Sequence, residues 1–146
     1  ELGTLAGDNS SQAFGVSADG SVVVGKSYLY QQNIEFGSRA FRWTAEGGMQ
    51  PLTNLFSRAN AVSADGNTIA GEVRTAGSIE AFRWTTGGGF QVLPRLPDAP
   101  PATTWASGIN ASGDITVGRS NDRATVWRNG VPEAMWNIVP INFVLR

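Results

Sequence analysis

The chain has 146 residues, with 11 basic and 12 acidic side chains and neither histidine nor cysteine. Its length suits one domain, and an apolar share of 41% with 16% charged residues indicates a folded globular chain. The missing residue types exclude Ser-His-Asp and Cys-His catalysis, imidazole or thiolate metal sites, and disulfides. A net charge of −1 means that the chain has no excess of basic residues for binding phosphate groups, so we expect no nucleic-acid partner.

The chain begins with an apolar segment, residues 1–7, which has neither the charged start nor the apolar run of a signal peptide. The segment matches the end of a repeat unit and predicts the last strand of a preceding unit. No stretch reaches the ~18 consecutive apolar residues of a spanning helix, so we expect no membrane span.

A segment of 13 residues then occurs three times in the sequence. It reads AFGVSADGSVVVG at 13–25, ANAVSADGNTIAG at 59–71 and ASGINASGDITVG at 106–118, with successive copies 46 and then 47 residues apart. Such self-similarity predicts a single domain built of repeats. The predicted units are residues 13–58, 59–105 and 106–137, followed by an extra C-terminal strand within 138–146.

The sequence of each unit predicts four short strands. In the first, residues 14–17 and 21–25 flank an Asp-Gly turn, and residues 39–44 alternate apolar and polar so that Phe41 and Trp43 share a face. A glycine turn leads to the fourth strand, and no segment shows helical spacing, so the fold class is all-β. Four-stranded units of this length are typical of β-propeller blades. A parallel β-solenoid is the alternative, although Asp-Gly between adjacent runs favours antiparallel hairpins.

The segments LGTLAG, GVSADGSVVVG, AFRWT and GGMQPL together resemble the HAF-repeat extracellular proteins of bacteria, which include passengers of autotransporters. The third unit departs from this pattern, because Ser112 stands in place of the turn Asp and Val126 in place of the Arg before Trp127. The resemblance implies a repeat-built β domain that is secreted or at the bacterial cell surface. It implies no catalytic residue. We also predict no cofactor.

Two kinds of connection vary in length between the units. From the last glycine of each repeat core to the following tryptophan the chain runs 18, 13 and 9 residues, and the link between units also varies. In an antiparallel meander these connections lie at one end, where varied loops on a rigid scaffold are typical of binding sites. The variable loops are residues 28–36, 94–105 and 120–123.

These loops combine aromatic side chains with amides and carboxylates, which a sugar-binding surface needs. A glycan or a protein is therefore the expected ligand. The alternative is that Tyr28, Phe36 and Trp105 only cover the ends of the blade core. The candidate ligand-binding residues are Tyr28, Tyr30, Glu35, Trp105, Asp122 and Arg123.

Other polar residues suit structural roles. Asp19 and Asp65 are expected to form the repeated turns by accepting backbone hydrogen bonds, and no spacing completes a calcium loop, so we predict no metal. Arg42 and Arg83, on the face opposite the tryptophans, are expected to bond carbonyls or carboxylates between blades.

Function is predicted as a non-catalytic extracellular scaffold or adhesin that presents the variable loops. One alternative is a structural repeat that self-assembles, because propellers typically need about four to eight blades and three leave open sheet edges. We therefore expect a homo-oligomer or part of a longer chain. A second alternative is a carbohydrate-active enzyme that uses paired carboxylates among Glu35, Asp98 and Asp122.

Overall fold

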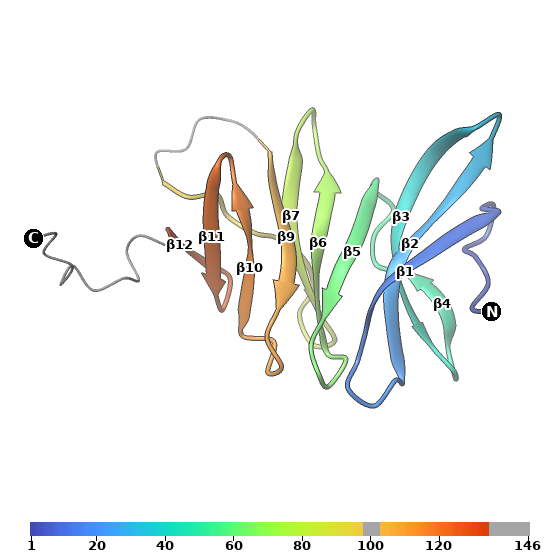
Figure 1. The fold of residues 1–146 in the computed structure, drawn as a ribbon, viewed down its shortest axis with the longest axis horizontal. Helices are drawn as coiled ribbons and strands as arrows, with labels where there is room; N and C mark the ends of the chain where they lie inside the picture. Colours follow the sequence, from blue (N-terminus) through green and yellow to red (C-terminus); the bar gives the residue numbers. More distant parts are fainter. Residues whose placement is uncertain (98–102, 135–146) are drawn as a thin grey trace, which may run out of the picture.

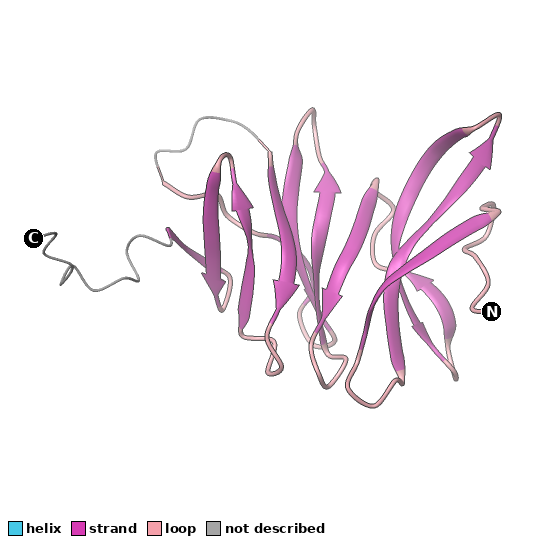
Figure 2. Ribbon diagram, viewed as in Figure 1, coloured by secondary structure: helices cyan, strands magenta, loops and turns pink. Residues whose placement is uncertain are grey.

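The computed structural model describes residues 1–97 and 103–134. In this part of the chain every regular element is a strand, and no helix that could span a membrane is present (Figure 2). The strands are β1 (Ser10–Val16), β2 (Val22–Gln31), β3 (Ile34–Thr44), β4 (Gly48–Pro51), β5 (Ser57–Val62), β6 (Thr68–Arg74), β7 (Ile79–Thr85), β8 (Gly89–Val92), β9 (Thr104–Ile109), β10 (Ile115–Ser120), β11 (Arg123–Arg128) and β12 (Val131–Ala134).

The strands form three sheets, each of four strands that pair with their neighbours in chain order. Every pairing is antiparallel, which confirms the predicted meander and excludes the parallel solenoid. The sheets lie side by side as blade 1 (β1–β4), blade 2 (β5–β8) and blade 3 (β9–β12) (Figure 1). The first strands of blades 2 and 3 pack on the blade before them, because β5 contacts β1, β2 and β3, and β9 contacts β5, β6 and β7.

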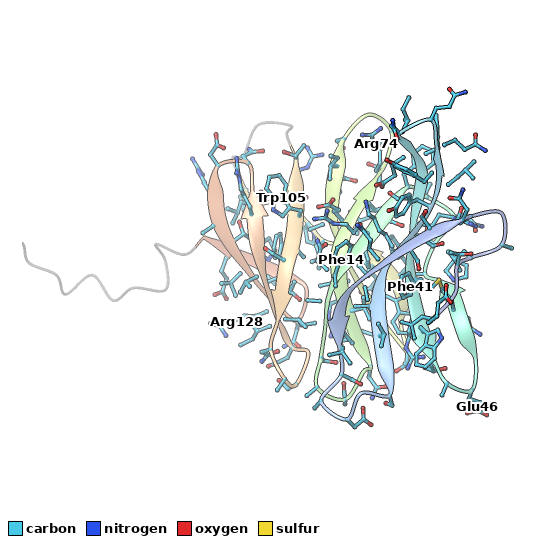
Figure 3. The ribbon with its side chains drawn as sticks, turned by 45° about the vertical axis from the view of Figure 1, so that its right-hand side comes forward. Phe14, Phe41, Glu46, Arg74, Trp105 and Arg128 are labelled. Carbon is cyan, nitrogen blue, oxygen red and sulfur yellow. The ribbon has the colours of Figure 1, made fainter. Side chains whose placement is uncertain are left out.

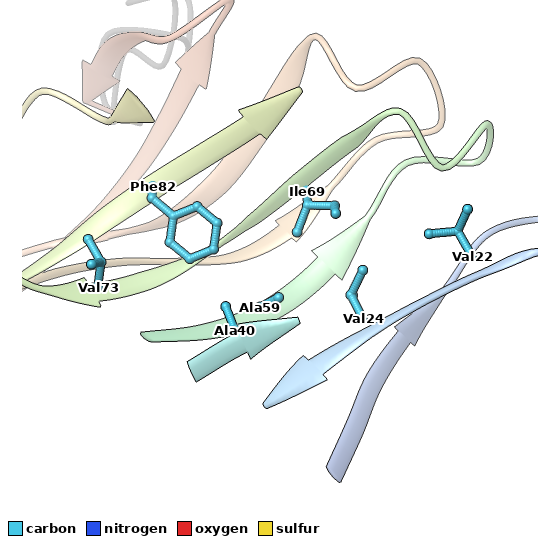
Figure 4. Close-up of a cluster of buried hydrophobic side chains, with 7 residues drawn as sticks. All are labelled: Val22, Val24, Ala40, Ala59, Ile69, Val73 and Phe82. Atoms are coloured by element: carbon cyan, nitrogen blue, oxygen red, sulfur yellow. The ribbon is translucent and has the colours of Figure 1, made fainter. Parts of the chain in front are cut away.

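The apolar core lies between neighbouring blades. Blade 1 contributes Val24 and Ala40 to a cluster in which blade 2 buries Ile69, Val73 and Phe82 (Figure 4). Since alternate strand residues face opposite sides, blade 2 meets one neighbour with each face. The cluster between blades 2 and 3 consists of Ala70, Ala81, Leu93, Ala106 and Trp127.

The two repeated arginines also lie between blades. Arg83 Nη2 donates a hydrogen bond to the carbonyl oxygen of Gly113 in blade 3 at 3.1 Å, as the sequence predicted. Arg42 instead places its guanidinium over the ring of Trp84 in blade 2, 5.8 Å from the centroid. Both guanidiniums therefore connect successive blades, one through a carbonyl and the other through an aromatic face.

The repeated Asp-Gly turns are held by carboxylates, as predicted. Asp19 Oδ1 accepts hydrogen bonds from Ser21 N at 3.0 Å and from Ser17 Oγ at 2.8 Å. The bond from the Ser21 backbone N–H, with those from the Ser21 and Ser17 hydroxyls, lowers the pKa of Asp19 from 3.8 to about 2. A hydrogen bond from the Ser63 hydroxyl is the main cause that lowers the pKa of Asp65 in blade 2.

The third turn keeps its carboxylate but moves it. Ser112 stands at the usual Asp position, and Asp114 accepts hydrogen bonds from the Ser112 hydroxyl and from Asn110 Nδ2. These bonds, the one from Ser112 first, lower the pKa of Asp114. The departure of the third unit from the repeat is therefore an exchange of partners within one turn.

We expect acid to weaken the fold through these three turns. A carboxylate whose pKa is lower in the folded than in the unfolded state stabilises the fold above its unfolded pKa, and this contribution disappears as the pH falls through the folded value. The melting temperature should therefore drop between about pH 4 and about pH 2. A variant carrying Asp19→Asn, Asp65→Asn and Asp114→Asn should show a flatter profile over this interval, and an unchanged slope would contradict the assignment.

Two predictions at the chain ends have different outcomes. Residues 1–7 contain no strand, because a fourth strand needs the third strand of its own blade as partner, and the described residues offer none. The segment is nevertheless fixed, since Leu5 is buried and its N–H donates to Ser27 Oγ at 2.9 Å. The predicted strand within 138–146 lies outside the described residues.

Candidate binding groove

The variable connections lie at one end of the blades, as predicted. The β2–β3, β6–β7 and β10–β11 turns occupy this end, and the Asp-Gly turns occupy the other (Figure 1). Figure 3 shows Arg74 at the former end and Glu46, in the β3–β4 turn, at the latter. We call the end with the variable connections the variable end.

The first variable segment is not a loop. Residues 28–36 continue β2 and β3 into a long hairpin, in which Tyr30 pairs with Glu35. The turn is made by Gln32 and Asn33, whose φ angles of 50° and 63° are those of a two-residue type I′ turn. Asparagine tolerates this left-handed conformation, so the strands could extend well past the predicted boundary.

A groove of about 440 Å³ lies between the hairpin of blade 1 and the adjoining strands of blade 2. It is open to solvent at the variable end. Blade 1 provides its wall from β2 and β3, and blade 2 provides the opposite wall from β5, β6 and β7. The lining residues are Lys26, Glu35, Phe36, Gly37, Ser38, Phe56, Ser57, Arg58, Glu72, Val73, Arg74 and Ile79.

Two ion pairs line the groove, one from each blade. Lys26 Nζ contacts the Glu35 carboxylate at 2.6 Å, and Arg58 Nε lies 3.6 Å from Glu72 Oε1. The Lys26 ammonium also lies 4.7 Å from the centroid of the Tyr28 ring. The groove thus combines charged hydrogen-bonding groups of both signs in fixed positions.

Apolar side chains project beside these charges. Phe36 is 47% exposed and Phe56 is 55% exposed, although both are large hydrophobic residues that normally prefer burial. Phe56 belongs to the link between blades 1 and 2, and its carbonyl oxygen accepts a hydrogen bond from Arg74 N at 2.7 Å. The link is therefore anchored to β6 while the Phe56 ring remains accessible.

The structure divides the six predicted ligand residues into two groups. Glu35 lines the groove, and Tyr28 lies next to it through Lys26, with the Tyr30 ring edge-on at 6.3 Å from the Tyr28 ring. The structure therefore brings these three blade 1 residues together, and Glu35 is the one of them that lines the groove.

The other three residues lie on blade 3. Trp105 is in β9 rather than in a loop, and the Arg119 guanidinium lies 4.8 Å from its ring centroid. Asp122, in the β10–β11 turn, forms an ion pair with the same Arg119, and Arg123 begins β11. Trp105 and Asp122 thus share Arg119 as a partner, and none of the three predicted residues lines the groove.

Sequence reasoning missed most of the groove wall. Lys26, Arg58 and Glu72 lie in regular strands, which reasoning from loop length does not reach. Phe56 lies in the short link between blades 1 and 2, whose residues were not singled out. A signal was present in the alternation of charged and apolar residues at the variable end of each predicted strand. It could be interpreted only after the blades were placed next to each other.

The two acids that line the groove are each paired with a base, Glu35 with Lys26 and Glu72 with Arg58. Neither pairing joins two of the carboxylates that the sequence offered for glycoside hydrolysis. Within residues 1–97 and 103–134, no cluster of three acidic side chains could hold a metal ion. Asp98, the third predicted carboxylate, lies outside the described residues.

Comparison with known proteins supports the architecture. No protein-family model matches the chain, and no curated protein matches it. Among solved structures the fold is similar to TolB from Acinetobacter baumannii, with a TM-score of 0.58, 14% identity and 91% of this chain covered. It is also similar to a protein assigned as TolB from Agrobacterium tumefaciens, with a TM-score of 0.54, 17% identity and 88% of this chain covered.

These similarities concern the fold. The chain spans 33% of the Acinetobacter baumannii protein and 50% of the Agrobacterium tumefaciens protein. The chain therefore consists of β-propeller-type blades, as the repeat predicted. At identities of 14% and 17% the binding properties of those proteins are not carried over.

Proposed function

We propose that this protein is a non-catalytic binding module whose ligand lies in the groove between blades 1 and 2. The observation that carries the proposal is the groove itself, a hollow of about 440 Å³ that joins two exposed phenylalanines to two ion pairs. Concave sites with apolar walls and a few fixed polar groups are the usual form of a ligand site.

A glycan is the ligand class that the chemistry favours. Aromatic rings stack on the apolar face of a pyranose, and charged side chains hydrogen-bond to its hydroxyl groups. Phe36 and Phe56 provide the rings, and Lys26, Glu35 and Arg58 provide donors and acceptors beside them. Because Lys26, Glu35 and Arg58 are already held in ion pairs, a neutral sugar can exchange hydrogen bonds with these side chains without leaving an unpaired ion.

The same proposal places the module outside the cell, secreted or on the bacterial surface. Its support is the resemblance of the repeated segments to HAF-repeat extracellular proteins. A scaffold of rigid blades that presents a groove at one end suits an adhesin or a display module.

A glycan array with the purified chain tests this function, followed by titration calorimetry with the best ligand. Phe36→Ala and Phe56→Ala should each weaken binding about tenfold or more, because truncating an aromatic contact residue typically costs about 1–2 kcal/mol or more. Both side chains are exposed, so both variants should fold normally.

Trp105→Ala is the matched control. It removes an aromatic residue that the sequence also suggested, but one that lies on blade 3 away from the groove. Its affinity should equal that of the wild type. Loss of binding in Trp105→Ala with retention in Phe36→Ala and Phe56→Ala would move the site to blade 3 and refute the groove. Binding of peptides but not of glycans would refute the ligand class.

A further inference from the structure

The row of three blades ends in two faces that no other described blade covers. The front face of blade 1 is formed by Ser11, Ala13 and Val16. The rear face of blade 3 is formed by Val117 and Ala124, with Ala111 in the adjoining turn. The repeat shows what these positions do elsewhere, because each has an equivalent inside the molecule.

Positions equivalent to the front face are buried in the internal junctions. Ala59 and Ala106 are 0% exposed where they meet the preceding blade, whereas the equivalent Ala13 is exposed. Val62 packs against the cluster between blades 1 and 2, whereas the equivalent Val16 is 59% exposed. The front face therefore has the apolar residues of a junction without its partner.

The rear face shows the complementary pattern. Val24 and Ala70 are 0% exposed against the following blade, whereas the equivalent Val117 is 43% exposed. Ala40 and Ala81 are also fully buried, whereas the equivalent Ala124 is exposed. An exposed apolar patch made of junction positions is typical of an interaction surface.

The polar contacts of the internal junctions can also be repeated. Ser57 Oγ accepts a hydrogen bond from Ala40 N at 2.9 Å, and Thr104 Oγ1 accepts one from Ala81 N at 2.8 Å. The equivalent acceptor on the front face of blade 1 is the Ser11 hydroxyl, and the equivalent donor on the rear face of blade 3 is the Ala124 N–H. The front and rear faces therefore have matching hydrogen-bonding groups.

The Asp-Gly turns add a second matching pair. Ala18 N donates to Ala64 O at 2.9 Å, and Ala64 N donates to Ala111 O at 3.0 Å, so the turns of successive blades form a chain of hydrogen bonds. Within residues 1–97 and 103–134, this series of hydrogen bonds stops at Ala111 N and Ala18 O, neither of which has a hydrogen-bond partner. Its two ends are a donor on blade 3 and an acceptor on blade 1.

The segment before blade 1 leaves the front face available. Leu5 N donates to Ser27 Oγ, and in the internal link to blade 3 Leu96 N donates to the equivalent Ser120 Oγ. Leu5 is therefore held by blade 1 in the way that Leu96, in the link from blade 2, is held by blade 3. This segment is compatible with a blade in front of blade 1.

We infer that the rear face of blade 3 binds the front face of blade 1 of a second copy of this chain, head to tail. The occupant is a second copy because Ser11, Ala13 and Val16 match in residue type the residues with which blades 2 and 3 contact the blade before them. Two copies joined in this way at both ends form a ring of six blades, within the usual range of about four to eight.

Sedimentation velocity of the purified chain and of two arginine variants tests this inference. The wild type should form a dimer, and Val16→Arg or Val117→Arg should each be monomeric, because each variant places a charge in one of the two faces. An equimolar mixture of the two variants should again form dimers, since one copy retains its rear face and the other its front face. Far-UV circular dichroism of each variant should match that of the wild type.

Val92→Arg is the control, because Val92 is also 43% exposed but lies on the outer strand of blade 2. This variant should dimerise like the wild type. A monomeric wild type at all concentrations would overturn the inference, as would variants that still dimerise or a mixture that stays monomeric.

Discussion

Gly71→Ala should destabilise the protein by about 3 kcal/mol or more, at the upper end of the cost of overpacking a core. A Cβ atom at this position would lie 1.9 Å from the carbonyl oxygen of Arg58 and 2.9 Å from Phe82 Cε1. The first obstacle is backbone of the paired strand β5, so relief requires β5 to move away from β6. Urea denaturation followed by tryptophan fluorescence measures the effect.

The same close approach occurs once in every blade. A Cβ atom at Gly25 would lie 1.9 Å from Gln12 O, and one at Gly118 would lie 2.0 Å from Trp105 O. In each blade the first strand has a register shift beside this glycine. The final glycine of the 13-residue repeat is therefore a packing requirement of the first strand pair.

Gly87→Ala is the matched control, because a Cβ atom there meets nothing within 4 Å and the residue has no positive φ. Its free energy of unfolding should stay within about 0.5 kcal/mol of the wild type, as for most surface substitutions. Equal stability of Gly71→Ala and Gly87→Ala would show that β5 does not approach β6 as closely as described.

The sequence was sufficient to predict the blades because local and periodic signals agree. Asp-Gly at the same place in successive units predicted the first hairpin, and alternation around Trp43 and Trp84 predicted the third strand. Strand ends were less predictable. The β2–β3 hairpin continues to a Gln32-Asn33 turn, in which both residues have positive φ angles. Without a glycine at the turn, the sequence gives only a weak signal for this conformation.

The candidate site was only partly predictable for a related reason. Variation in loop length identified the end of the blades at which the groove lies, and it included Glu35 and Phe36. It could not identify Arg58 and Glu72, because they reach the groove through the packing of blade 2 on blade 1 rather than through a loop. Trp105 was selected for its place after a proline-rich link, but strand pairing in β9 directs it to blade 3.

Phe82→Ala should cost about 3–5 kcal/mol, the usual range for emptying a buried phenylalanine site. The side chain is fully buried between blades 1 and 2, where its ring stacks on Phe90 with 4.7 Å between centroids. The cavity would open along the junction that also forms the groove. Phe36→Ala, which truncates an exposed phenylalanine, should change stability by no more than about 0.5 kcal/mol.

The double variant Gly71→Ala/Phe82→Ala separates the two obstacles at Gly71. Removing the Phe82 ring leaves only the Arg58 carbonyl in the way of the new Cβ atom, so Gly71→Ala should cost less in this background than in the wild type. It should not become neutral, because the 1.9 Å approach to backbone remains. Additive costs would mean that the ring and the new Cβ atom do not share space, since residues in contact show an interaction energy. That result would contradict the described position of the Phe82 ring, which is buried between blades 1 and 2.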